Sequence, residues 1–365
     1  METLELKKDK IYLGLKRDII SGRLPSGGKL PRETDLAREL GVGRITLRAS
    51  LDRLENDGFI KRIHGKGTFI YPDGATPDVA TIMVIHGADS GFELPWHYIV
   101  PELTRCATEK QLKAFITTNT AIDMFSESDI RQFVKSNHIV GIANVTNSFN
   151  GDEPFLTKIK SAGVPVVITH GTMDDAEVTG FPCIAVSEKD GWEAAIAYLA
   201  GLGHRQIAII GHTDNVSTGL RDYSLTETLQ LLEKYHAVPD KSLIRLTKFD
   251  RQEIIGTVKS FCSNPVKPTA ILCFSDFYAI YVYDALNELK LRIPQDVAVM
   301  GTCGYPDARM LNPPLSTIDY GYAEFARMAV EMLEEPEKWF DPVTGKGKLR
   351  LKQCKLVKRQ STEPK

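Results

Sequence analysis

The chain has 365 residues, more than one ordinary hydrophobic core holds and enough for two or three domains. Hydrophobic residues make up 42% and charged residues 25%, values near the globular average that exclude extensive disorder. No apolar run reaches the roughly 18–20 residues of a membrane-spanning helix, and the first ten residues lack the apolar segment of a secretory signal. The six cysteines include no CxxC pair, which argues against a zinc site or a disulfide framework. These features predict a cytoplasmic protein that has no membrane partner, metal or other cofactor.

The net charge of -2 conceals an uneven distribution along the chain. Residues 1–72 contain 15 basic and 10 acidic side chains, whereas the remaining residues contain 30 and 37. A basic first segment favours nucleic-acid binding at one end of the chain. Chance segregation of surface charge explains the same counts equally well, so charge alone does not decide the matter.

Three helices are predicted in this basic segment. Residues 6–21 carry apolar side chains at four-residue spacing, and two further helices span about 32–40 and 44–57. The last two are joined by Gly41-Val42-Gly43, and two short helices around a glycine turn are typical of a helix-turn-helix. In that motif the start of the second helix contacts base edges in the major groove.

A β-hairpin is predicted next, with strands at 59–63 and 68–71 around a basic, glycine-rich tip. Glycine allows the backbone to approach phosphates, and Lys66 or His64 can neutralise a phosphate or enter a groove. A helix-turn-helix followed by such a hairpin is a winged helix.

This segment resembles the DNA-binding domain of GntR-family transcription regulators over nearly all of residues 6–71. The Leu-Pro pair, the Val-x-Arg-x-Thr-Leu-Arg recognition segment and the Gly-x-Gly-Thr wing of that family are present. The resemblance implies that the recognition segment contacts the major groove and that the wing lies in or beside the minor groove. The implied DNA contacts are Arg32, Arg44, Thr46, Arg48, His64, Gly65 and Lys66. Thr34 and Gly43 depart from the family pattern. These departures affect which operator is recognised and not whether DNA is bound.

Beyond a linker at 73–77, apolar strand-like runs alternate with amphipathic helical segments such as 190–202, 224–235 and 277–289. About eight strands are predicted, at 79–85, 114–118, 139–144, 164–169, 183–186, 207–210, 270–274 and 297–300. This alternation predicts parallel sheets covered by helices on both faces. A single sheet is compatible with the pattern, but two lobes of βα units fit the size better. The predicted fold class is a winged helix-turn-helix (α+β) followed by a two-lobed α/β domain with parallel sheets.

Several body segments resemble the LacI-type regulatory domain, which is itself similar to periplasmic sugar-binding proteins. They follow one another over about 180 residues, and the matching pieces are 186–188, 202–211, 274–279, 293–301, 313–318 and 359–362. The resemblance implies a periplasmic-binding-protein-like domain with two lobes joined by crossing strands. It also implies a ligand cleft between the lobes and an outer face that forms a dimer.

Ligand residues in open α/β sheets gather at the carboxyl ends of strands. Applied to the predicted strands, this rule selects Trp96, His97, Asn144, His170, Asp276, Cys303 and Tyr305. Aromatic rings stack on the apolar face of a sugar, while amides and carboxylates hydrogen-bond its hydroxyls. Loop position or core packing is the alternative explanation for each residue, and Trp96 and Asp276 are the strongest candidates.

Two positions depart from the LacI-type ligand pattern. The usual arginine after the Gly211 strand aligns with Gly219, which leaves Arg221, two residues further on, as the candidate donor. The usual Gly-Tyr/Phe-Asp carboxylate aligns with Cys303. A cleft without this donor and acceptor is predicted to take a less polar or unusual carbohydrate, or no ligand at all.

The sequence therefore predicts a DNA-binding transcription regulator, with repression favoured, whose affinity is controlled by a small carbohydrate-like ligand. Its predicted partners are a pseudo-palindromic double-stranded DNA operator, a sugar or sugar derivative, and a second copy in a homodimer. A ligand-independent regulator with a vestigial cleft is the alternative. An enzyme is disfavoured because GxSxG, HExxH and P-loop motifs are absent, and no catalytic residue is predicted. The predicted domains are 1–72, which binds DNA, and 78–365, which binds ligand and dimerises.

Overall fold

The computed structural model describes residues 7–20, 23–24, 28–56, 59–63, 65–70, 79–87, 95–212 and 224–363. The expected linker at 73–77 lies outside these residues. The chain divides into two compact units, Met1–Ala185 with Ala323–Arg350, and Val186–Tyr322 with Leu351–Lys365.

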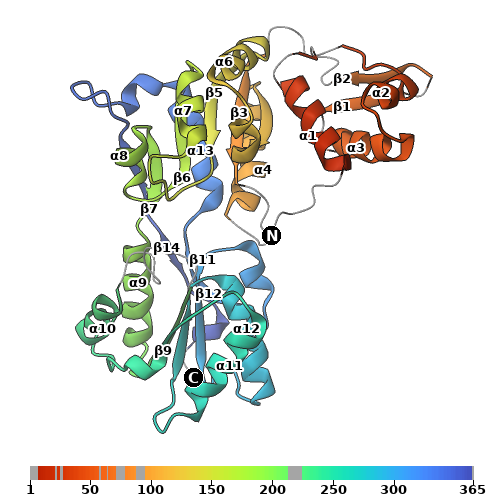
Figure 1. The fold of residues 1–365 in the computed structure, drawn as a ribbon. Helices are drawn as coiled ribbons and strands as arrows, with labels where there is room; N and C mark the ends of the chain where they lie inside the picture. Colours follow the sequence, from red (N-terminus) through yellow and green to blue (C-terminus); the bar gives the residue numbers. More distant parts are fainter. Residues whose placement is uncertain are drawn as a thin grey trace. The chain divides into compact units, whose positions relative to one another are not determined.

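The N-terminal part of the first unit combines three helices with a two-stranded antiparallel sheet (Figure 1). Its elements are α1 (Lys7–Ile20), α2 (Glu33–Glu39), α3 (Arg44–Asn56), β1 (Ile60–Ile63) and β2 (Gly67–Ile70). We refer to residues 7–70 as the head. The apolar faces of the elements meet in a core in which Leu47 and Leu54 are fully buried. The predicted winged helix is confirmed, and the element bounds lie within one residue of the prediction.

The rest of the first unit is built on a six-stranded sheet with the order β13-β7-β6-β5-β3-β4. Its strands are β3 (Thr81–His86), β4 (Lys113–Thr118), β5 (Ile139–Asn144), β6 (Val166–Gly171), β7 (Cys183–Val186) and β13 (Leu349–Lys352). Its helices are α4 (Trp96–Glu109), α5 (Asn119–Asp123), α6 (Glu127–Ser136), α7 (Pro154–Ser161), α8 (Asp175–Thr179), α13 (Tyr322–Glu334) and the 3-10 helix η3 (Pro336–Trp339). Strands β3 to β7 pair in parallel, because an intervening helix returns the chain each time. We call this sheet and its helices lobe 1.

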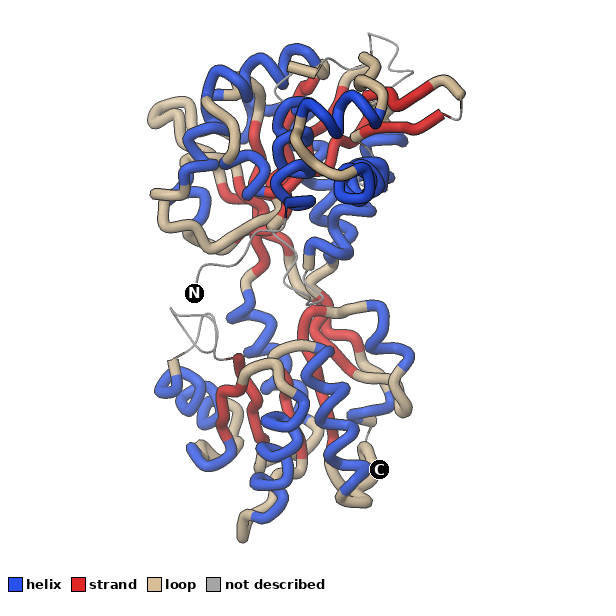
Figure 2. The backbone as a smooth tube through the Cα atoms, turned by 45° about the vertical axis from the view of Figure 1, so that its right-hand side comes forward, coloured by secondary structure: helices blue, strands red, loops and turns tan. Residues whose placement is uncertain are grey.

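The second unit, which we call lobe 2, has a six-stranded sheet with the order β14-β12-β11-β10-β8-β9. Its strands are β8 (Ile207–His212), β9 (Ile244–Thr247), β10 (Ala270–Cys273), β11 (Ala298–Cys303), β12 (Ser316–Asp319) and β14 (Lys355–Val357). Its helices are α9 (Glu188–Gly201), α10 (Leu225–Lys234), α11 (Arg251–Ser263), α12 (Asp276–Glu288), η1 (Lys241–Leu243), η2 (Pro306–Met310) and η4 (Gln360–Thr362). Helices α9 and α10 lie on one side of the sheet and α11 and α12 on the other (Figure 1), and Figure 2 shows the strands as a layer among the helices. The neighbouring strands of this sheet pair in parallel, except β12 and β14, which are antiparallel.

The body contains two separate sheets, which confirms the prediction of two βα lobes and not the alternative of a single sheet. The strand count of about eight was wrong, because the described part of the body contains twelve strands. The four that the pattern missed are β9, β12, β13 and β14. Strands β9, β13 and β14 are three or four residues long, carry basic side chains and lie at sheet edges, so they lack the continuous apolar run of a buried strand.

Candidate functional site

The packing of α3 against the rest of the head determines which of its residues face solvent. Its inner side is formed by leucines that are at most 1% exposed, namely Leu47, Leu51 and Leu54. Gly41 in the preceding turn has φ of 63°, a left-handed conformation that favours glycine. Because the helix repeats every 3.6 residues, the opposite side presents Arg44 and Arg48, which are exposed, while Thr46 is half-buried.

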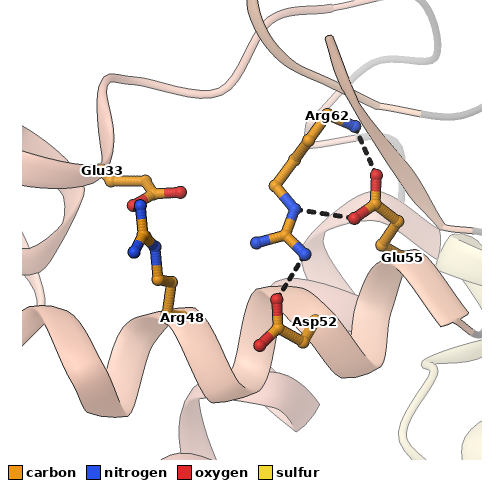
Figure 3. Close-up of polar contacts among 5 residues, drawn as sticks. All are labelled: Glu33, Arg48, Asp52, Glu55 and Arg62. Carbon is orange, nitrogen blue, oxygen red and sulfur yellow. Dashed lines mark hydrogen bonds and ion pairs between the residues drawn. The ribbon is translucent and has the colours of Figure 1, made fainter. Parts of the chain in front are cut away.

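An acidic neighbour holds Arg48 on this face. Its Nε donates a hydrogen bond to Oε2 of Glu33, at the start of α2, over 3.1 Å (Figure 3). The Arg48 side chain remains 67% exposed, so most of the guanidinium is available to a ligand. Arg44 is exposed and has no ion pair in the described part of the chain, and Arg32 is an exposed residue that immediately precedes α2.

A third arginine joins the wing to α3. The backbone N–H and the Nε of Arg62, on β1, each donate to Glu55 over 2.7 Å, and its Nη2 donates to Asp52 (Figure 3). The Arg62 backbone N–H and guanidinium lower the pKa of Glu55 below its usual value. Burial opposes the charge of Arg62, but its two carboxylate partners raise the pKa of Arg62 above normal. This three-residue contact fixes the orientation of β1 against α3.

The tip of the wing is exposed and depends on glycine. Gly65 and Gly67 have φ of 72° and 114°, which lie in the left-handed region, and Lys66 between them is exposed. The Lys66 N–H donates to the Ile63 carbonyl oxygen over 3.0 Å, closing a tight turn. Lys66 is thereby presented to solvent, while His64 lies outside the described residues.

Trp96 marks the carboxyl edge of the lobe 1 sheet. It is the first residue of α4, and its ring lies 4.3 Å from that of His86, the last residue of β3, and 3.8 Å from that of His97. The indole Nε1 is buried and has no hydrogen-bond partner in the described part of the chain. An unpaired buried N–H costs free energy, so a ligand oxygen placed here would be stabilised.

Asn144 ends β5 and His170 is the last residue but one of the neighbouring strand β6, and they are 0% and 4% exposed. Asn144 Nδ2 donates to Oγ1 of Thr146 over 2.9 Å. His170 Nδ1 lies 3.2 Å from Nδ2 of Asn147, and its ring meets that of Phe325 edge-on at 5.1 Å. Both side chains have partners within lobe 1, and a contact with ligand stays a prediction for each.

Asp276 lies at the start of α12 in lobe 2, but its carboxylate points into the protein. The side chain is 2% exposed, with Oδ1 accepting from the Thr317 hydroxyl over 2.6 Å and Oδ2 from the Tyr305 N–H over 2.7 Å. A Cβ on Gly301 would collide with Oδ1, so glycine at 301 makes room for this carboxylate. Burial raises the pKa of Asp276 to about 7. The Asp276 carboxylate thereby holds the loop after β11, and a contact between Asp276 and ligand stays a prediction.

Cys303 and Tyr305 are also part of the lobe 2 interior. Cys303 ends β11 with φ of 93°, a conformation that costs a non-glycine residue about 1–3 kcal/mol. Burial raises the pKa of the Cys303 thiol to about 12, so the thiol is neutral near pH 7. The centroid of the Tyr305 ring lies 4.6 Å from that of Phe277 and 5.3 Å from that of Tyr322. An uncharged, partly aromatic layer therefore occupies the place where the LacI-type pattern has a carboxylate.

Arg221 lies outside the described residues, so the expected donor after β8 is not placed. Among the residues described, no group of three or more His, Cys, Asp or Glu side chains is arranged to hold a metal ion. None of the helices described is long and apolar enough to cross a bilayer. No sequence pattern indicated Glu33 or Thr317, because each acts through a partner distant in the sequence.

Two family models match the chain. The model described as "Bacterial regulatory proteins, gntR family" covers residues 7–70, and that of the "Periplasmic binding protein-like domain" covers residues 196–362. They coincide with the head and with most of lobe 2, so both resemblances inferred from the sequence are confirmed.

Known regulators are similar over much of the chain. An arabinose metabolism transcriptional repressor of Geobacillus stearothermophilus is 24% identical, over 88% of this chain and 90% of its own length, which agrees with an architecture like that of the bacillar arabinose repressor. A ribose operon repressor of Haemophilus influenzae is 32% identical, over 50% of this chain and 54% of its own length. The crystal structure of a LacI-family regulatory protein from Chloroflexus aggregans covers 77% of this chain and 98% of its own, with a TM-score of 0.60 and 22% identity. The chain is accordingly a DNA-binding transcription regulator and not an enzyme, with a GntR-type head and a periplasmic-binding-protein-like body.

Proposed function

We propose that α3 of the head enters the major groove of an operator and that the wing tip contacts the flanking backbone or minor groove. The observation that carries this proposal is the outward face of α3, where Arg44 and Arg48 are exposed on a helix fixed from behind by buried leucines. Arginine reads guanine through O6 and N7. Lys66 at the exposed wing tip supplies a cation for phosphate, which carries no sequence information.

Substitution of these residues separates base contacts from phosphate contacts. Arg44→Ala and Arg48→Ala should each cost about 1–3 kcal/mol on a duplex selected by the protein, and much less on a scrambled duplex. Lys66→Ala should weaken both duplexes alike and reduce the slope of log affinity against log salt by about 0.9. Fluorescence anisotropy measures all of these quantities, and wild-type affinity in both arginine variants would refute the assignment.

We further propose that a sugar or sugar derivative binds at the carboxyl ends of the strands and changes the affinity for DNA. The unpartnered indole N–H of Trp96 supports a ligand at this edge of lobe 1. Two of the similar proteins are named for arabinose and ribose, which favours a carbohydrate. The neutral Cys303 in place of a carboxylate favours a ligand that is less polar than a free pentose or hexose, or one that is modified or phosphorylated.

A ligand panel tests this proposal directly. The panel contains free pentoses and hexoses, phosphorylated sugars, and alkyl or aryl glycosides, and each is tested for its ability to raise the melting temperature of the full chain. A ligand at 100 times its Kd stabilises the fold by about 2.7 kcal/mol, so binding is detectable as a higher melting temperature. Any that does so is added to the DNA-binding assay, where allosteric coupling of about 1–3 kcal/mol is typical. Failure of every compound would favour a ligand-independent regulator.

We also propose that the cytoplasmic, working form is a homodimer that presents two heads to a pseudo-palindromic operator, with a DNA-binding domain at 1–72, a linker at 73–77 and a ligand-binding and dimerisation domain at 78–365. Support comes from the GntR match, which ends at residue 70, next to the proposed boundary. A twofold operator requires a twofold protein. Sedimentation of the protein alone and bound to its selected duplex tests the stoichiometry.

A further inference from the structure

Ile45 lies on the outward face of the recognition helix and is almost fully exposed. It is the second residue of α3, and 88% of its surface is accessible. Its neighbours on either side are Arg44, which is exposed, and Thr46. Because residues three and four apart share a helix face, Ile45 also adjoins Arg48 and the exposed Ala49. An apolar strip thus lies alongside the two arginines proposed to read bases.

Exposure alone does not make an apolar residue functional, since single exposed hydrophobics are common on protein surfaces. The position of Ile45 supplies the second observation, because the first turn of the second helix is the part of a helix-turn-helix that meets base edges. Among the described residues of the head, the other large hydrophobic residue with an exposed side chain is Leu40, which is only 41% exposed and lies at the end of α2. Ile45 therefore combines the greater exposure with a place at the base-reading end.

We propose that Ile45 is a specificity-determining residue that packs against the 5-methyl group of a thymine in the operator. Only thymine among the standard bases presents a methyl group in the major groove. Isoleucine has no hydrogen-bonding group, so a base that places an amino or keto group where thymine places its methyl would be desolvated without compensation. Its branched Cβ restricts the side chain to few rotamers, so little conformational entropy is lost on contact. The inference rests on the proposed entry of α3 into the major groove.

Removal of a single methyl group from the DNA tests this contact. The full chain selects a duplex from a random pool, and each thymine of the best duplex is replaced in turn by deoxyuridine, which lacks only the 5-methyl. At one thymine in each half-site the wild type should lose about fourfold in affinity, the equivalent of about 0.8 kcal/mol for one buried methyl-sized group. Ile45→Ala should bind the thymine duplex more weakly and should no longer distinguish thymine from deoxyuridine there.

Two controls keep the result interpretable. Arg48→Ala should bind more weakly overall and still prefer thymine at that position, because its side chain reads another base. Ile45→Ala should melt at the wild-type temperature or slightly above, since the side chain is exposed and alanine favours helix.

The proposal is overturned if the wild type binds every deoxyuridine duplex as tightly as the thymine duplex, if the selected half-sites contain no thymine, or if Ile45→Ala keeps the preference. Failure to select any duplex would instead overturn the proposed mode of DNA binding, together with this inference. Tight selection without a methyl preference refutes the Ile45 contact alone.

Discussion

Replacement of Asp276 by asparagine should remove a pH-dependent loss of stability from lobe 2. Burial raises the pKa of Asp276 to about 7 from its ordinary 3.8, although the hydrogen bond from Thr317 lowers it in part. As pH rises above 3.8 the unfolded chain gives up this proton while the folded chain retains it, so the free energy of unfolding falls until the pH passes about 7. Between pH 5 and pH 8 the loss is about 2–3 kcal/mol, at about 1.4 kcal/mol for each unit of pKa difference.

Asparagine fits the same contacts without a charge. Its Oδ1 can accept from the Tyr305 N–H, and its Nδ2 can donate to Thr317 Oγ1, which itself lies 3.4 Å from the Ile318 carbonyl oxygen and can donate to it. The hydrogen bonds with Tyr305 and Thr317 are kept in this exchange, which limits its cost. Asp276→Asn should therefore match the wild type near pH 5 and exceed it in stability at pH 8.

Unfolding of lobe 2 can be followed by the fluorescence of Trp192, which lies in α9 and is 4% exposed. The chain has three tryptophans, so phenylalanine at 96 and 339 leaves this single reporter in the full chain. Urea titrations at pH 5 and pH 8 give the two free energies, and Asp307→Asn, at an exposed position on η2, serves as the matched control. Equal pH dependence in the wild type and Asp276→Asn would refute the assignment.

Four further substitutions test the packing inferred above. Glu33→Gln should lower the ratio of specific to non-specific DNA affinity, because it loosens Arg48 and removes a negative charge from the DNA-facing side; an unchanged ratio in anisotropy would contradict this role. Arg62→Met removes the hydrogen bonds from the guanidinium to Glu55 and Asp52, and it should destabilise the head by about 1–2 kcal/mol. Thermal melting of the variant against the wild type measures this loss. Gly301→Ala should destabilise lobe 2 by about 1–3 kcal/mol, as monitored by tryptophan fluorescence. Gly256→Ala, within α11 and with open space around the new methyl, should instead stabilise it by up to about 1 kcal/mol.

The head could be predicted almost residue by residue because its determinants are local. Apolar spacing sets each helix, and glycine sets the turn before α3 and the tip of the wing. Strand β12 shows the opposite case. Ser316 is fully buried there because its N–H donates to Ser361 Oγ over 2.8 Å and its hydroxyl to the Arg359 carbonyl oxygen over 2.9 Å. These partners lie more than forty residues away, so a short polar run gave no sign of an interior strand.

The same limit applies to the residues at the carboxyl edges of the sheets. The strand-end rule locates Trp96 and Asp276 at such an edge, as the structure does. It does not determine the direction of a side chain, which depends on the neighbouring strands. The Asp276 carboxylate turns inward because Thr317 and the Tyr305 N–H offer donors and Gly301 leaves space. The place of a side chain after a strand is therefore predictable from the sequence, whereas its direction follows only from its hydrogen-bond partners.

Charge in the head illustrates why a count of basic residues overstates the cations available to DNA. Arg62 is only 28% exposed and forms ion pairs with Asp52 and Glu55. Arg53 pairs with Asp9 over 3.2 Å, and its guanidinium lies 3.9 Å from the centre of the Tyr12 ring. Arg62 is held within the fold by two carboxylates, and Arg53, although 54% exposed, already shares its charge with Asp9, so each offers less charge to phosphate than an unpaired cation does. Because the salt dependence of binding counts phosphates that are actually neutralised, at about 0.9 per contact, the two pairs should contribute little to it. Arg44, exposed and without an ion pair in the described part of the chain, should contribute fully if it meets a phosphate and should instead affect specificity if it meets a base.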